Sequence, residues 1–126
     1  MIKHIVMWNL RGDTAAERSR NVAVLKAEFE SLRGRIPGLL HLEIGVDESR
    51  IDYACDVVLY SEFDSREALA AYASHPEHLR VKRALGELRT ARHQVDYEAP
   101  ASDRARHPVP HGTAQPEPGD NHVQAV

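Results

Sequence analysis

Cysteine is nearly absent from this chain of 126 residues, and so are long apolar runs. Its one cysteine, Cys55, excludes an intramolecular disulfide and a thiolate metal cluster built within one chain. Lys3 and His4 are followed by only a few apolar residues before Arg11, too few for a signal-peptide core, and no segment is long enough to span a bilayer. These absences predict a protein of a reducing, cytoplasmic compartment with no membrane partner.

An excess of positive charge is also missing. The formal net charge is −3, from 16 Lys and Arg against 19 Asp and Glu, which gives no broad electrostatic attraction to nucleic acid or anionic membranes. The chain has no glycine-rich phosphate loop, no nucleophile elbow and no Rossmann signature. We therefore predict no nucleic-acid partner, no nucleotide-dependent chemistry and no cofactor.

Composition changes near Ala99 and divides the chain into a domain, residues 1–98, and a tail, residues 99–126. The tail carries five of the seven prolines, little apolar content and no periodicity, so it cannot bury enough surface to offset the entropy lost on ordering. We predict that it is disordered. Its histidines, His107, His111 and His122, match no familiar metal-ligand spacing and are expected to be solvated.

The acidic loop that contains Asp47, Glu48 and Asp52 is the other place where a cation could bind. A solvated loop explains these carboxylates more simply. We predict no metal site.

Hydrophobic periodicity predicts six regions of secondary structure within the domain. They are strands over Ile2–Leu10, Leu39–Val46, Tyr53–Phe63 and Ala91–Glu98, a helix from Thr14 to about Gly34, and a helical region from Asp64 that is broken before Pro76 and continues to Leu88. The order β-α-β-β-α-β is typical of a ferredoxin-like α+β fold, with a four-stranded antiparallel sheet and helices on one of its faces.

The first strand has two partly apolar faces, because alternate residues point to opposite sides. Ile5 and Met7 lie on the face opposite the one that carries Trp8. A second subunit's sheet could cover them and close a barrel across a two-fold axis. We therefore predict a homodimer, a dimeric α+β barrel.

Titratable side chains gather around Pro76. Histidine has the unperturbed pKa nearest neutrality, so His75 and His78, close to Tyr72, are candidates for proton transfer. The residue before a proline avoids helical angles, so His75 is expected to be extended and to cap the next helix, with catalysis as the alternative. His78 lies three residues before Val81, on the apolar stripe of that helix, and should point inward.

His4 can reach the same region from the apolar face of the first strand. Inward polar groups are costly unless they are paired or line a cavity, so His4, Tyr72 and His78 together indicate a pocket. These three are the candidate catalytic residues. The candidate ligand-binding residues are His4, Val6, Trp8, Tyr72, His75 and His78.

Five segments resemble the stress-responsive A/B barrel (Dabb) family, in an order and spacing that cover about the first 98 residues. They are MIKHIVMW at 1–8, IPGLLHLEIGV at 36–46, LYSEF at 59–63, AYASHPEHLRVK at 71–82 and VDYE at 95–98. The resemblance implies a dimeric α+β barrel with a cavity between helices and sheet in each subunit. The family includes stress proteins and a cofactor-free polyketide cyclase of the olivetolic acid cyclase type, whose working histidines and tyrosine match His4, Tyr72 and His78.

The leading functional prediction is a stress-response-type barrel that binds a small apolar or aromatic molecule, with undetermined activity. The alternative is a cofactor-independent acid/base enzyme, a polyketide cyclase or aldol-type lyase. In it a neutral His78 would be the general base and Tyr72 would stabilise the developing enolate oxygen. Trp8 on the cavity face would reduce the room for an extended polyketide. Cofactor-free monooxygenation, which other dimeric ferredoxin-like barrels perform, is a third possibility.

Overall fold

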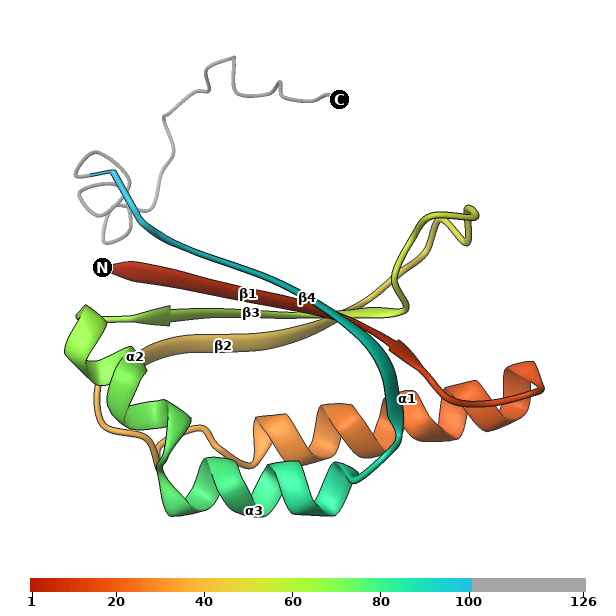
Figure 1. The fold of residues 1–126 in the computed structure, drawn as a ribbon, viewed down its shortest axis with the longest axis horizontal. Coiled ribbons are helices and arrows are strands. Elements are labelled where there is room, and N and C mark those ends of the chain that lie inside the picture. Colours follow the sequence, from red (N-terminus) through yellow and green to blue (C-terminus); the bar gives the residue numbers. More distant parts are fainter. Residues whose placement is uncertain (101–126) are drawn as a thin grey trace.

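The computed structural model describes residues 1–100 and consists of one sheet with all its helices on one face (Figure 1). Residues 101–126, most of the predicted tail with its three histidines, lie outside the described residues. The elements are β1 (Ile2–Leu10), α1 (Ala15–Glu30), β2 (Leu39–Val46), β3 (Val57–Phe63), α2 (Arg66–Ala73), α3 (Pro76–Leu85) and β4 (Arg89–Glu98). The predicted ferredoxin-like fold is confirmed, with the second helical region divided into α2 and α3.

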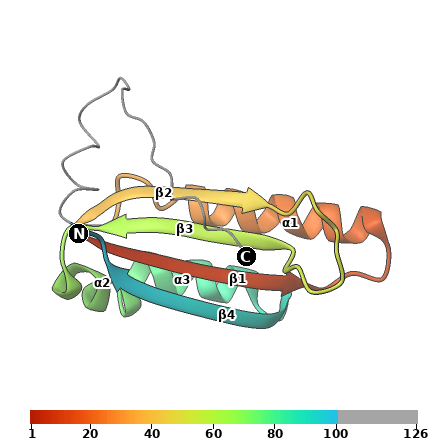
Figure 2. The ribbon, with the colours of Figure 1, turned by 90° about the horizontal axis from the view of Figure 1, so that it is seen from above.

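The sheet has the strand order β2-β3-β1-β4, and every neighbouring pair is antiparallel (Figure 2). β1 is therefore a central strand. On one side His4 pairs with Ser61 of β3, and on the other it pairs with Asp96 of β4. This register places an acidic side chain from the end of the domain beside a histidine from its beginning.

The first helix begins as its sequence predicts. The Thr14 hydroxyl accepts a hydrogen bond from the Glu17 amide at 3.1 Å, and the Glu17 carboxylate accepts from the Thr14 amide at 3.2 Å, which completes a capping box. α1 ends at Glu30, and a turn that includes Gly34, with φ of 80°, leads on to β2. The helix is thus about one turn shorter than predicted.

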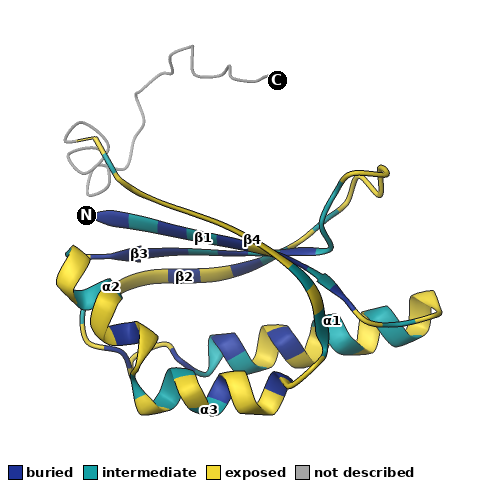
Figure 3. Cartoon of the chain, viewed as in Figure 1, coloured by how far each residue is buried: buried dark blue, intermediate teal, exposed yellow. Residues whose placement is uncertain are grey.

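The core lies between the helices and the face of the sheet that carries the even-numbered residues of β1 (Figure 3). Leu25 and Phe29 form the buried stripe of α1, which Leu32 continues in the turn after the helix, and Val81 and Leu85 form the stripe of α3. Burying an aliphatic or aromatic side chain of this size contributes about 1.5–3 kcal/mol, so these stripes fix the helices on the sheet.

The other face of the sheet is open in a single subunit. Met7, Val95 and Tyr97 are 38%, 52% and 44% exposed, and Ile5 beside them is half-buried. The alternation predicted for β1 is therefore confirmed, with an apolar strip on the side away from the helices.

None of the helices within residues 1–100 is both long and apolar enough to cross a membrane.

Candidate functional site

A cavity of about 550 Å³ lies between the sheet and the helices, and it is where most of the predicted site residues meet. Its wall includes His4, Val6 and Trp8 from β1, Tyr72 from α2, His78 and Lys82 from α3, Phe29 from α1, Leu59 from β3, Gly86 from the α3–β4 connection, and Arg89 to Arg92 from β4. The structure thus brings together five of the six predicted ligand-binding residues. The sixth, His75, does not line this cavity.

His75 shapes the turn between α2 and α3. Its backbone is extended, with φ of −65° and ψ of 137°, and its Nδ1 accepts a hydrogen bond from the Glu77 amide at 3.0 Å. Pro76 is the first residue of α3, where its missing N–H leaves no intrahelical bond unmade. His75 is therefore the N-cap that ends one helix and starts the next, which places Tyr72 and His78 on either side of the turn.

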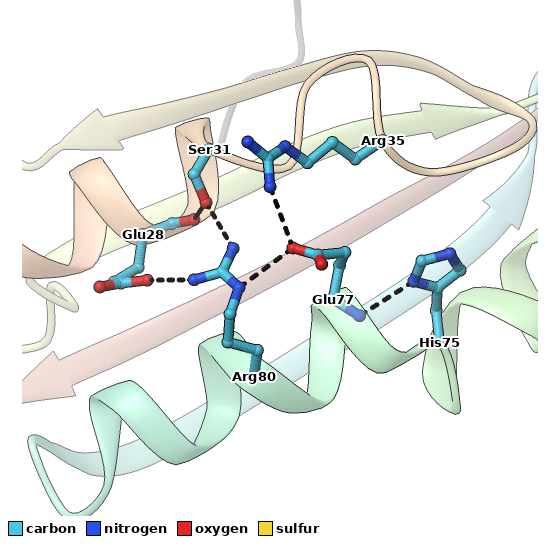
Figure 4. A network of polar contacts seen from close by, with 6 residues as sticks. All are labelled: Glu28, Ser31, Arg35, His75, Glu77 and Arg80. Carbon is cyan, nitrogen blue, oxygen red and sulfur yellow. Dashed lines mark hydrogen bonds and ion pairs between the residues drawn. The ribbon is translucent and has the colours of Figure 1, made fainter.

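A polar network holds α3 against α1 (Figure 4). The Arg80 guanidinium donates to Glu77 at 3.0 Å, to Glu28 at 3.0 Å and to the Ser31 hydroxyl at 2.9 Å. Arg35 reaches the same Glu77 carboxylate at 3.4 Å. This side of α3 faces away from the cavity, so the network positions the helix without occupying the candidate site.

His78 has one ring nitrogen engaged and one available. Its Nδ1 lies 3.2 Å from the Ala73 carbonyl oxygen, and since a carbonyl only accepts, Nδ1 carries the hydrogen and Nε2 keeps its lone pair. Burial lowers the pKa of His78 below its ordinary 6.5, against the hydrogen bond to Ala73, and the charges of Lys82 and Arg89 lower it further. The imidazole is thus neutral near pH 7 and able to accept a proton.

Tyr72 is 4% exposed, and its hydroxyl has no hydrogen-bond partner among the described residues. Its ring centroid is 4.1 Å from that of His78 and 6.1 Å from that of His4. Burial raises the pKa of Tyr72 well above its usual value, so the hydroxyl stays protonated and can donate.

A carboxylate on the neighbouring strand β4 holds the side chain of His4 in place. Its Nδ1 is 2.6 Å from Asp96 Oδ1, and Gln94 donates to the other oxygen of Asp96 at 2.9 Å. An ionised carboxylate can only accept, so this pair fixes a hydrogen on Nδ1 of His4 and leaves Nε2 for another partner. Asp96 was not among the predicted site residues.

Trp8 is an aromatic residue of the cavity wall. Its ring stacks on Phe29 with centroids 5.2 Å apart, and its Nε1 is buried without a hydrogen-bond partner in the described part of the chain. Trp8 Nε1 and Tyr72 Oη are the two buried side-chain polar atoms of residues 1–100 that lack a partner, and both residues line this cavity.

Comparison with known proteins places the chain in a family. The model of the stress responsive A/B barrel domain, Dabb, matches residues 2–99. The chain belongs to the Dabb family. None of the curated proteins compared with this Dabb domain matches it.

Solved structures with the same fold include dimeric proteins. A dimeric protein of unknown function and ferredoxin-like fold from Bacteroides fragilis has a TM-score of 0.69 and 33% identity, over 78% of this Dabb domain's chain and 95% of its own. A dimeric ferredoxin-like protein of unknown function from Jannaschia has a TM-score of 0.63 and 24% identity, over 78% and 98% of the two chains. Hydroxynitrile lyase from Passiflora edulis has a TM-score of 0.67 but 13% identity, over 79% and 94%, and at that identity it shares the fold alone.

Three cationic residues of the cavity wall are not among the site residues predicted from the sequence of this Dabb domain. Lys82 lies one turn beyond His78 on α3, and Arg89 and Arg92 lie at the start of β4. The predicted strand begins at Ala91 and therefore leaves out Arg89. Extending the strand's alternation back from Asp96 to Arg92 would have put that arginine on the cavity face.

The acidic loop of this Dabb domain makes internal bonds. Asp47 accepts from the Ser49 hydroxyl at 2.9 Å and from the Arg50 amide at 2.8 Å, and these bonds lower the pKa of Asp47. Within residues 1–100, no group of three or more His, Cys, Asp or Glu side chains could hold a metal ion.

Proposed function

We propose that this Dabb domain binds a small, largely apolar or aromatic molecule in the cavity between sheet and helices. The observation that carries the proposal is the pair of unpartnered buried donors, Trp8 Nε1 and Tyr72 Oη, on two residues that line one cavity. Leaving a buried donor unsatisfied costs about 1–3 kcal/mol, so a ligand with acceptor atoms would recover free energy there. A cavity of about 550 Å³ is within the usual range for small-molecule sites.

The apolar part of such a ligand would lie against Trp8 and Phe29. Their stacked rings, with centroids 5.2 Å apart, form an aromatic part of the cavity wall, and Val6 and Leu59 extend the apolar wall. Aromatic faces favour offset or edge contacts with a further ring, which is why an aromatic compound suits the site.

The test is a thermal-shift screen of small aromatic compounds, followed by calorimetric titration of the compounds that raise the melting temperature. Tyr72→Phe should weaken binding of a hydroxyl- or carbonyl-bearing compound about 3- to 10-fold, the usual net worth of one hydrogen bond. The matched control is Tyr60→Phe, which removes a hydroxyl that donates to Glu62 on the opposite face of the sheet. Equal affinity of wild type and Tyr72→Phe for every bound compound would contradict the proposal.

A second candidate function is cofactor-independent acid/base catalysis of the polyketide cyclase or aldol type. It is supported by the free Nε2 of a neutral His78 next to a protonated Tyr72. In that reaction His78 Nε2 would take a proton from a carbon next to a carbonyl group, and Tyr72 would donate a hydrogen bond to the enolate oxygen that forms. The enolate carbon would then attack a second carbonyl, and His78 would return the proton.

Turnover separates binding from catalysis. Each compound that binds is incubated with wild type, His78→Gln and Tyr72→Phe, and its consumption is followed by chromatography. A catalytic role predicts that wild type transforms the compound and that His78→Gln retains affinity but loses the rate. Binding without transformation by wild type would restrict the function to ligand binding.

A further inference from the structure

We propose that the molecule bound in this cavity carries a carboxylate, held by Arg89 and Arg92 at the β4 side of the site. The inference rests on the proposed ligand-binding function and specifies the chemical class of the ligand. The inference follows from a comparison of the basic side chains that make ion pairs or hydrogen bonds with those that make neither.

Most of the basic side chains within residues 1–100 make ion pairs or donate hydrogen bonds. Arg80 binds Glu77 and Glu28, Arg50 binds Asp47 and Asp56, and Arg33 donates to the Leu42 carbonyl. The basic side chains of this range with neither an ion pair nor a hydrogen bond are Arg20, Lys82, Arg83, Arg89 and Arg92. Three of these five line the one cavity.

Arg89 is the most informative of the three. It is half-buried, and its guanidinium lies 5.8 Å from the centroid of the Trp8 ring. Burial, and secondarily the charge of Arg92, lower the pKa of Arg89. A partly desolvated guanidinium beside a second cation is unfavourable unless an anion compensates it.

No acidic residue of the described chain lines the cavity to provide that compensation. The ionisable groups in its wall are His4, Tyr72, His78, Lys82, Arg89 and Arg92. Asp96, a carboxylate on the same face of β4 as Arg92, is already bound to His4 and Gln94. The site therefore has two or more positive charges and no protein anion of its own.

A carboxylate fits this arrangement better than a halide or another spherical anion. Guanidinium groups present planar pairs of N–H donors that match the two oxygens of a carboxylate. With its carboxylate at Arg89 and Arg92, an aromatic acid would place its ring beside Trp8, over which Arg89 also lies. The other end of the molecule would meet the donors of Tyr72 and the lone pair of His78.

The experiment compares 2-naphthoate with 2-naphthamide, which have nearly the same shape and differ in charge. Calorimetry with the full chain at low and high salt gives the affinity of each. Wild type should bind the acid about tenfold or more tightly than the amide, as expected for charge-assisted hydrogen bonds. Arg89→Gln and Arg92→Gln should each lower the ratio of acid affinity to amide affinity by most of this tenfold preference, and thermal unfolding of each variant shows that it is folded.

Arg83→Gln is the matched control, since it removes the same charge from an exposed, unpaired arginine that does not line the cavity. It should keep the preference for the acid. Equal binding of acid and amide by wild type would overturn the carboxylate inference and leave the ligand cavity intact. An equal effect of Arg83→Gln would overturn it too, because the preference would then come from net charge. Failure of both compounds to bind would overturn the proposed cavity function together with this inference.

Discussion

Tyr72 and Tyr60 provide opposite cases of a phenol within one small domain. Tyr72 is buried with an unpartnered hydroxyl, whereas the half-buried Tyr60 donates its hydroxyl to Glu62, and burial together with this bond raises the pKa of Tyr60 to about 12. A buried hydroxyl without a partner at a cavity lowers stability, and such a cost is typical of a functional residue. Replacing each tyrosine by phenylalanine measures the contribution of its hydroxyl to stability.

We predict that Tyr72→Phe leaves the free energy of unfolding unchanged or raises it by about 1 kcal/mol, because it removes an unsatisfied buried hydroxyl. Tyr60→Phe should lower it by about 0.5–1.5 kcal/mol, because it removes a hydrogen bond and leaves Glu62 without that donor. Urea denaturation of the ligand-free variants measures both. A loss of stability in Tyr72→Phe as large as that in Tyr60→Phe would mean that the Tyr72 hydroxyl has a structural role.

Folding disfavours the charged form of His78, so the stability of the protein should depend on pH through this side chain. Its pKa in the folded state lies below the ordinary 6.5, so the unfolded chain binds the proton more readily. The stability that depends on neutral His78 is therefore fully present above about pH 6.5 and is lost as pH falls through the folded pKa.

We expect the decrease in unfolding free energy between pH 7.5 and pH 5 to be smaller in His78→Gln than in wild type. Nitrogen NMR of the ring should show the hydrogen on Nδ1 and none on Nε2 near pH 7, as the bond to Ala73 requires. A hydrogen on Nε2 instead would remove His78 as a candidate base.

Among the secondary structure elements, the turn between α2 and α3 is fixed by His75. We predict that His75→Ala lowers the free energy of unfolding by about 0.5–2 kcal/mol, the usual worth of an N-cap. His75→Asn should restore most of it, because asparagine is among the best N-caps and can accept from the Glu77 amide as His75 Nδ1 does.

Ligand binding distinguishes this structural role from the predicted ligand-binding role of His75. His75→Asn should bind the same compounds as wild type with equal affinity, because His75 does not line the cavity. A specific loss of affinity in a variant of restored stability would assign His75 to the site.

The same elements show how far sequence patterns can predict this structure. β1 could be predicted from Ile2 to Leu10, since its alternation decides which side chains face the helices. β3 begins at Val57 and not at Tyr53, because the Asp56 carboxylate binds the Leu10 amide at 2.7 Å and ends the loop there. A contact between residues so distant in sequence leaves no local signal.

Local sequence patterns likewise predict some residues of the candidate site and not others. Helical and strand periodicity point His4, Tyr72 and His78 inward, because burial repeats with the local structure. Alternation puts Asp96 and Arg92 on one face of β4, but only the register of β4 against β1, which joins residues about ninety positions apart, places them beside His4 and Trp8. That register depends on the complete sheet and is not readable from either strand alone.

For the whole molecule, the open sheet face is the largest feature that a single subunit leaves unexplained. The exposed apolar residues of this face lie on the central strand β1 and on the edge strand β4 beside it, and the similar proteins from Bacteroides fragilis and Jannaschia are dimeric. Two such faces packed about a two-fold axis would bury the strip in both subunits, and stable interfaces of this kind cover at least about 1,200 Å² in total.

We predict that the wild-type chain has twice the subunit mass of 14.1 kDa in light scattering coupled to size-exclusion chromatography. Val95→Lys should shift it to the monomer, because the two-fold axis would place one lysine from each subunit in an apolar interface. Leu79→Lys is the control, since Leu79 is 37% exposed on α3, on the opposite side of the sheet, and its variant should stay dimeric. A monomeric wild type at micromolar concentration would rule out this interface, and a dimer that persists in Val95→Lys would place it elsewhere on the molecule.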